Sequence, residues 1–108
     1  MALSDVFRRQ TKWTLADALE RHRLAPETFR IPDERATGSL QVGDRVKLVV
    51  EPEKGLPERM WVVVTAVSDV GLAGSFHSDA VEMIGLHAGD AVQFERRHVV
   101  AIGRRVAE

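Results

Sequence analysis

The sequence contains no cysteine and no tyrosine. Without cysteine, the chain cannot have a disulfide framework, a thiolate zinc site, an iron–sulfur cluster or a cysteine nucleophile. It also contains no apolar run that approaches the roughly 18 residues of a membrane-spanning helix. Charged residues interrupt the N-terminal segment, where a signal peptide would need an apolar stretch. We therefore expect a cytoplasmic protein with no membrane partner, whose stability depends on its hydrophobic core.

Neither sign of charge dominates the chain. Fifteen basic residues face sixteen acidic residues, which gives a formal net charge of −1. Proteins that bind nucleic acids in general usually show a strong basic excess, and this chain does not. The length of 108 residues and the 44% of hydrophobic residues are typical of one globular domain, so we predict a single domain over 1–108.

The first quarter of the chain predicts a helical arm over residues 1–25. Thr14 is a candidate N-cap with Asp17 three residues later, which approximates a capping box. Three apolar residues and a histidine follow at helical spacing, namely Leu15, Ala18, Leu19 and His22. Pro26 disfavours helical backbone at Ala25, so the helix should end near Leu24.

Two prolines and a glycine in residues 26–41 predict an irregular connection, from which Phe29 and Ile31 reach the core. In residues 42–103, apolar residues alternate with polar ones or form short runs. This pattern predicts five short strands, at 45–50, 59–67, 72–77, after Gly89–Asp90, and at 98–103. The strand 59–67 is apolar on both faces, which predicts a central strand covered on both sides with Trp61 in the core. Gly74 predicts a bulge or a sharp bend.

Together these segments predict an α+β fold: an N-terminal helical arm followed by a small, strongly bent antiparallel β-barrel of the SH3-like kind over 42–103. An open α+β sheet packed by the helix is the alternative. The open edge of such a barrel could pair two copies by strand addition, so a homodimer is compatible with the pattern.

The chemistry-bearing residues do not form a catalytic pattern. Ser75, His77 and Asp79 alternate, but same-face neighbours on a strand stand nearly 7 Å apart, whereas a Ser–His–Asp triad needs hydrogen-bond contact. No nucleophile elbow surrounds Ser75. We predict a polar strand face and no catalytic residue. A deep pocket at His77 and Asp79 would instead favour an unrecognised hydrolase or a ligand-binding protein.

The four histidines show no recognised metal-ligand spacing, and no glycine cluster matches a phosphate-binding loop. The sequence therefore predicts no metal and no cofactor. Arg96–Arg97 and Arg104–Arg105 give a basic C-terminal end that could bind nucleic acid, or could simply keep an edge strand soluble. Trp13 either packs at the start of the helix or, if exposed, contacts another protein.

Five segments carry a resemblance to a known family: TFRIP at 28–32, VGDRVKLVV at 42–50, ERMWVVVTAV at 58–67, GLAGSF at 71–76 and GLHAGDAVQFERRHVVAI at 85–102. Together they resemble a bacterial family of uncharacterised small domains related to immunity proteins of polymorphic toxin systems. The resemblance implies binding of a partner protein, with Arg59 as a contact and with Met60 and Trp61 as packing residues. Family members carry an Asn–Asp–Pro-like turn after the third strand, and here only Asp79 matches it.

These observations predict a non-catalytic module that binds another protein. The candidate binding residues are Arg59, Trp13, His77, Asp79, Arg96 and Arg97. The alternative is a nucleic-acid-binding barrel that uses the C-terminal arginines.

Overall fold

Strands make up most of the fold, and two short helices lie beside them. The computed structural model describes residues 12–81 and 83–103. The elements in chain order are β1 (Trp13–Leu15), α2 (Ala18–Leu24), α3 (Glu34–Gly38), β2 (Arg45–Pro52), β3 (Glu58–Val67), β4 (Leu72–Phe76), β5 (Ala91–Phe94), the 3-10 turn η1 (Arg96–His98) and β6 (Val99–Gly103). The fold is α+β, as the sequence predicts.

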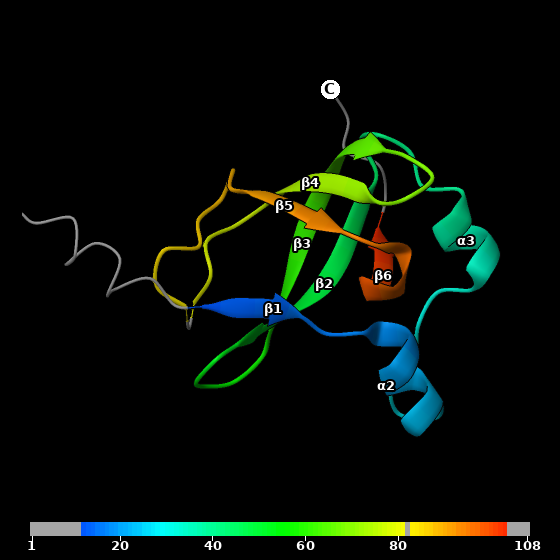
Figure 1. Ribbon diagram of the computed structural model, residues 1–108, viewed down its shortest axis with the longest axis horizontal. Helices are drawn as coiled ribbons and strands as arrows, with labels where there is room; N and C mark the ends of the chain where they lie inside the picture. Colours follow the sequence, from blue (N-terminus) through cyan, green and yellow to red (C-terminus); the bar gives the residue numbers. More distant parts are fainter. Residues whose placement is uncertain (1–11, 82, 104–108) are drawn as a thin grey trace, which may run out of the picture.

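The six strands form one antiparallel sheet with the order β1-β2-β3-β4-β5, and β6 also pairs with β2. β3 occupies one edge of β2 along residues 45–50, so β6 and β1 share the opposite edge. β6 pairs with the first half of β2 and β1 with its end. The sheet curls on itself into a small, nearly closed barrel, and both helices lie at one side of it (Figure 1).

The inside of the barrel is a continuous hydrophobic core. Every second residue of the two longest strands points inward, and the buried side chains that result are Val46, Leu48, Val50, Met60, Val62 and Val64. Phe76 of β4 and Val92 and Phe94 of β5 complete this core. The predicted inward positions of Val92 and Phe94 are therefore confirmed.

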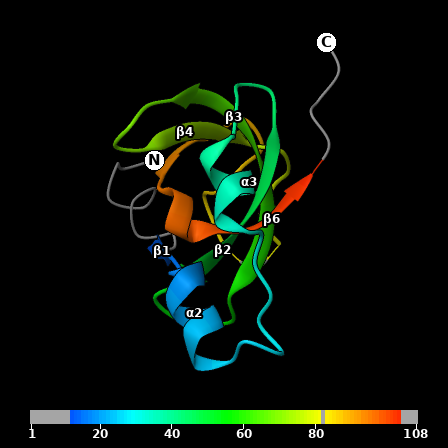
Figure 2. The same ribbon diagram turned by 90° about the vertical axis from the view of Figure 1, so that its right-hand side faces the viewer.

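A second, smaller cluster lies on the outer side of β2 and β6. It consists of Ala16, Ala18, Val49 and Val100, with Phe29 and Ile31 packed against it. A register shift in β6 turns Val100 outward, beside the outward-pointing Val49. Figure 2 looks onto the side that carries this cluster, with β6 running between α3 above and α2 below. Phe29 and Ile31 thus do fasten their segment to the barrel, as predicted, although through this outer cluster.

The start of the arm differs from the prediction. Trp13–Leu15 form a strand, not the first turn of a helix, and pair with Val50–Pro52 of β2. The helix begins at Ala18, with Asp17 as its N-cap in place of Thr14, and ends at Leu24 as predicted. Leu19 is 55% exposed, so the predicted apolar stripe is only partly buried. Residues 1–11 lie outside the described residues.

The predicted irregular connection contains one short helix, α3, which Asp33 caps by accepting a hydrogen bond from the backbone N–H of Ala36 at 2.8 Å. The predicted hairpin between β3 and β4 is present, since the backbone N–H of Ser68 donates to the carbonyl of Gly71. The last strand begins at Val99, because residues 96–98 form η1.

Gly74 lies where β3 and β4 come closest together. A Cβ at this position would lie 2.3 Å from Val62 Cγ1 and 2.8 Å from the carbonyl oxygen of Val63. The pairing register of β3 shifts nearby, between Val64 and Ala66. The predicted bulge is therefore next to Gly74, but its extra residue, Thr65, belongs to β3 and not to the strand of Gly74.

The prediction that β3 is covered on both sides is wrong. β3 lies between β2 and β4, but only Met60, Val62 and Val64 are buried. Trp61 and Val63 point outward and are half-buried, so Trp61 lies outside the core. None of the helices in the described part of the chain is long and apolar enough to cross a membrane.

Candidate binding face

The outer side of β2 and β3 has one half that neither helix of the described residues covers. Strand alternation and register place Arg45, Lys47, Trp61 and Val63 on this half, and Arg59 at its border, opposite the covered Val49; we call these five residues the open face. Lys47 lies opposite Trp61, and Arg45 lies opposite Val63. Three of the five residues are cations, so this face differs strongly from the nearly neutral chain as a whole.

Trp61 forms the centre of the open face. The Lys47 Nζ lies 4.7 Å from the centroid of the Trp61 ring, and the Arg45 Cζ lies 5.1 Å from it. The far edge of the ring reaches Gly103 of β6, where a Cβ would lie 3.1 Å from the Trp61 Cζ3 atom. Cations within about 6 Å of an aromatic centroid are attracted by the ring. The indole therefore lies across β2, in contact with Arg45, Lys47 and β6.

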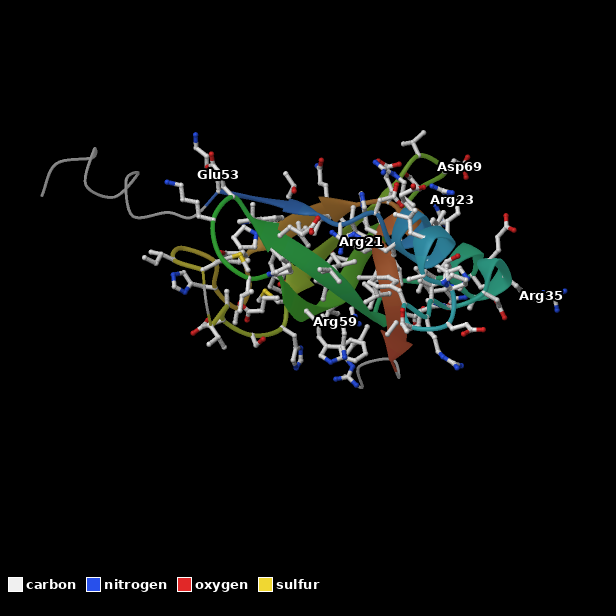
Figure 3. All side chains as sticks on the ribbon, turned by 90° about the horizontal axis from the view of Figure 1, so that it is seen from below. Arg21, Arg23, Arg35, Glu53, Arg59 and Asp69 are labelled. Atoms are coloured by element: carbon white, nitrogen blue, oxygen red, sulfur yellow. The ribbon has the colours of Figure 1, made fainter. Side chains whose placement is uncertain are left out.

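Arg59 makes the second contact of this kind. Its Cζ lies 5.4 Å from the ring centroid of Phe29, which is itself packed on the outer cluster. Figure 3 shows Arg59 on the underside of the sheet, away from the labelled Arg35 at the far end of the molecule. Within residues 12–81 and 83–103, neither Arg59 nor Lys47 forms a salt bridge with a carboxylate.

His77 borders the open face, and Asp79 lies beyond it. The backbone N–H of His77 donates to the carbonyl of Trp61 at 2.9 Å, and the His77 side chain is exposed. Asp79 instead accepts a hydrogen bond from the backbone N–H of Ala88 at 2.8 Å. In the described chain no hydrogen bond joins the side chains of Ser75, His77 and Asp79. The arrangement is that of exposed polar residues.

Arg96 and Arg97 lie on η1, away from the open face. Arg97 forms ion pairs with Asp17 at 2.9 Å and with Glu95 at 3.2 Å. Arg96 donates to the carbonyl of Ser68 at 3.2 Å. Both arginines are thus engaged within the chain, and Arg104 and Arg105 lie outside the described residues. η1 and α2 border a groove whose apolar lining includes Leu19, Ile31 and Val99.

The contacts of Arg97 also affect two carboxyl groups. The pKa of Asp17 is lowered, first by the hydrogen bond from the backbone N–H of Glu20 and further by Arg97. The hydrogen bond from Arg97 likewise lowers the pKa of Glu95. These carboxylates therefore stay ionised, and the pair of Asp17 with Arg97 fastens η1 to α2.

His98 is the buried titratable group of this region. Its side chain is 9% exposed, and its Nδ1 accepts the backbone N–H of Glu95 at 2.9 Å. Burial lowers the pKa of His98, because the charged imidazolium loses hydration. An imidazole that accepts through Nδ1 must carry its proton on Nε2. His98 is therefore a neutral structural residue near pH 7.

Trp13 belongs to the barrel. Its ring packs edge-on against Phe76, with the centroids 5.9 Å apart. It is half-buried beside the main core, so it packs, but in the barrel and not at the start of the helix. The structure thus separates the predicted residues: only Arg59 belongs to the open face, with His77 at its border.

Metal ligands do not gather in the structure. No group of three or more His, Asp or Glu residues in the described ranges could hold a metal ion.

Comparisons with protein-family models, with curated proteins and with solved structures find no match for this chain. The SH3-like barrel type and the family resemblance therefore remain predictions.

The sequence interpretation did not single out Arg45 or Lys47, and it assigned Phe29 to the core and not to a binding site. The alternation of Arg45 and Lys47 with buried residues was visible, and it placed both on one face of a strand. What it could not show is that Trp61 lies opposite Lys47, because register depends on pairing partners far apart in the sequence.

Proposed function

We propose that this chain is a non-catalytic module that binds another protein through the open face. The observation that carries the proposal is the pair of cations, Lys47 and Arg59, that lie over aromatic rings without a salt bridge to any described carboxylate. Tryptophan and arginine are the residue types most enriched where binding energy concentrates in protein interfaces.

The ordered rings favour binding further. An interface residue that already has one position loses less conformational entropy when a partner arrives. Trp61 is held by β6 and two cations, and Phe29 by the outer cluster. The resemblance to domains related to immunity proteins also favours a protein partner. The proposal keeps the cytoplasmic location that the sequence predicts.

The test is affinity capture from a lysate of the source organism, run in parallel with and without nuclease. The wild-type chain, Arg59→Glu and the matched control Arg35→Glu are immobilised in equal amounts. Arg35 is an exposed arginine on α3, apart from Arg59 in Figure 3. We expect one stoichiometric protein on the wild type and on Arg35→Glu, and about tenfold less on Arg59→Glu, as for a hot-spot residue.

Equal capture by both variants would contradict the proposal, because binding would then occur elsewhere on the chain. Capture that disappears with nuclease would instead support the nucleic-acid alternative.

A further inference from the structure

The chemistry of the open face also specifies what the partner presents to it. We infer that the partner protein binds through carboxylate side chains on an extended segment, which reach Arg59 and Lys47. This inference rests on the proposed function, and it adds the chemical class of the partner surface.

The first argument comes from Arg59. A guanidinium is planar and carries its five N–H donors around its rim. The Arg59 guanidinium carbon lies over the ring of Phe29, which offers no hydrogen-bond acceptor, and no described carboxylate forms a salt bridge with Arg59, so its donors can bind a ligand. A carboxylate accepts two parallel hydrogen bonds from such a rim. Arg59 is therefore arranged as a carboxylate receptor.

The second argument comes from the spacing of the two cations. Lys47 lies opposite Trp61 and Arg59 opposite Val49, so Lys47 and Arg59 are diagonal neighbours on one face. Diagonal neighbours across an antiparallel pair are about 7–8 Å apart. On an extended strand, side chains two residues apart on the same face are separated by about 7 Å. Two acidic residues in the pattern acid–any–acid therefore match this spacing.

The third argument distinguishes an acidic protein from a nucleic acid. Single-stranded nucleic acids bind barrels by stacking their bases on free aromatic faces. Here the aromatic rings of the region already carry cations: Trp61 contacts Arg45 and Lys47, and Phe29 contacts Arg59. With a net charge of −1, the rest of the chain adds no attraction for a long polyanion. A carboxylate, in contrast, needs only the N–H donors of these cations and no free aromatic face.

The experiment is a titration followed by nuclear magnetic resonance of the full wild-type chain. The probe is a ten-residue peptide in which serine and glutamate alternate. The comparison ligand is hexathymidylate, which carries the same five negative charges. The reporters are the Arg59 Nε–H and the Trp61 indole N–H. The indole of Trp13 is the internal control, because it packs against Phe76 on β1, away from the open face.

We expect the peptide to shift the Arg59 and Trp61 signals and to leave the Trp13 signal in place. Binding should weaken about tenfold in Arg59→Gln, which corresponds to one lost strong contact. Arg59→Lys keeps the charge and loses the planar donor fork, so its affinity for the peptide should lie between that of the wild type and that of Arg59→Gln. Arg35→Gln should bind like the wild type, and added salt should weaken binding throughout.

Tighter binding of hexathymidylate than of the peptide would overturn the inference and favour a nucleic-acid partner. Absence of shifts with the peptide would overturn it as well. The two proposals can fail separately. Capture that depends on Arg59 but occurs without peptide binding would contradict only the acidic partner, whereas capture that ignores Arg59 would remove the proposed function too.

Discussion

The outer side of the β2–β3 pair has two halves that differ in what covers them. In the covered half, Val49 is 4% exposed and packs with Val100 beneath α2 and the segment of Phe29. In the open half, the next outward residues of the same strand are Lys47 and Arg45, which surround Trp61. One strand thus changes from core to surface within two residues.

This difference shows that the outer face has two separate roles. The covered half fastens the helical arm to the barrel, and Arg21 of α2 strengthens this attachment by pairing with Glu51 of β2. The open half has no such role in the described structure, and yet it carries a half-buried tryptophan and three cations. Contiguous arrangements of this kind are typical of interaction sites.

The largest predicted effect on stability is that of a lysine at Val49, compared with a lysine at Val63. Each lies opposite an arginine on the neighbouring strand, so Val49→Lys and Val63→Lys create the same like-charge pair. Val49→Lys also buries the new charge, which should lower the free energy of unfolding by about 3–5 kcal/mol. Val63→Lys should cost at most about 1 kcal/mol, from repulsion alone. Urea denaturation measures both, and equal losses would contradict the division into two halves.

The next predicted effect concerns the helix that covers Val49. Asp17 caps α2 by accepting the backbone N–H of Glu20 at 3.1 Å. Asp17→Ala should therefore lower the free energy of unfolding by about 1 kcal/mol. Asp17→Asn keeps the capping oxygen and loses only the exposed ion pair with Arg97. It should therefore lower the free energy of unfolding by only about 0.3 kcal/mol. Thermal denaturation distinguishes the two, and a loss as large for Asn as for Ala would assign the effect to the ion pair.

The third prediction concerns pH. Burial lowers the pKa of His98 in the folded state below its unfolded value near 6.5, so the unfolded chain binds a proton more readily. The stability that neutral His98 provides is fully present above about pH 6.5 and is lost as the pH falls through the folded pKa. The urea concentration at the unfolding midpoint should therefore decrease as the pH is lowered from 7 to 5.

His98→Asn is the control for this prediction. Asparagine can place an acceptor near the former Nδ1 and does not titrate in this range. The variant should be less stable at pH 7, and its midpoint should change less between pH 7 and pH 5. An identical pH dependence in wild type and variant would show that another group is responsible. The carboxylates Asp17 and Glu95, whose pKa values are lowered, titrate at more acidic pH.

The smallest predicted effect on stability lies in the open half. Arg59→Gln and Lys47→Gln remove cations that form no salt bridge with a described carboxylate. Each should change the free energy of unfolding by no more than about 1 kcal/mol, the value of an exposed cation–aromatic contact. The same variants should weaken capture of the partner. A stability loss as large as that of Val49→Lys would show that these cations have a structural role instead.

Several features of the fold could be read from local sequence. The end of α2 before Pro26, the hairpin at Ser68 and the inward positions of Val92 and Phe94 each depend on a short segment. Local preference failed at Trp13–Leu15, where pairing with the end of β2 replaces the helical turn. That pairing joins residues far apart in the sequence, and a short window cannot show it.

The candidate site was harder to predict than the fold. Apolar residues on both faces of β3 indicated burial on both sides, but the helical arm is short and reaches only the half that includes Val49. How far the helical arm extends over the sheet decides whether an outward side chain is buried or exposed. Arg59 was identified through the resemblance, whereas the contact with Phe29 requires the folded connection.

The most direct test of the account is a methyl and indole spectrum of the full chain, recorded with and without the purified captured partner. Val63 and Trp61 report on the open half, and Val49 reports on the covered half. The account predicts that the signals of Val63 and Trp61 shift on binding by more than the methyl signals of Val49, which is buried opposite Arg59. Shifts concentrated at Val49 and at the groove beside Arg97, with Trp61 unchanged, would contradict it.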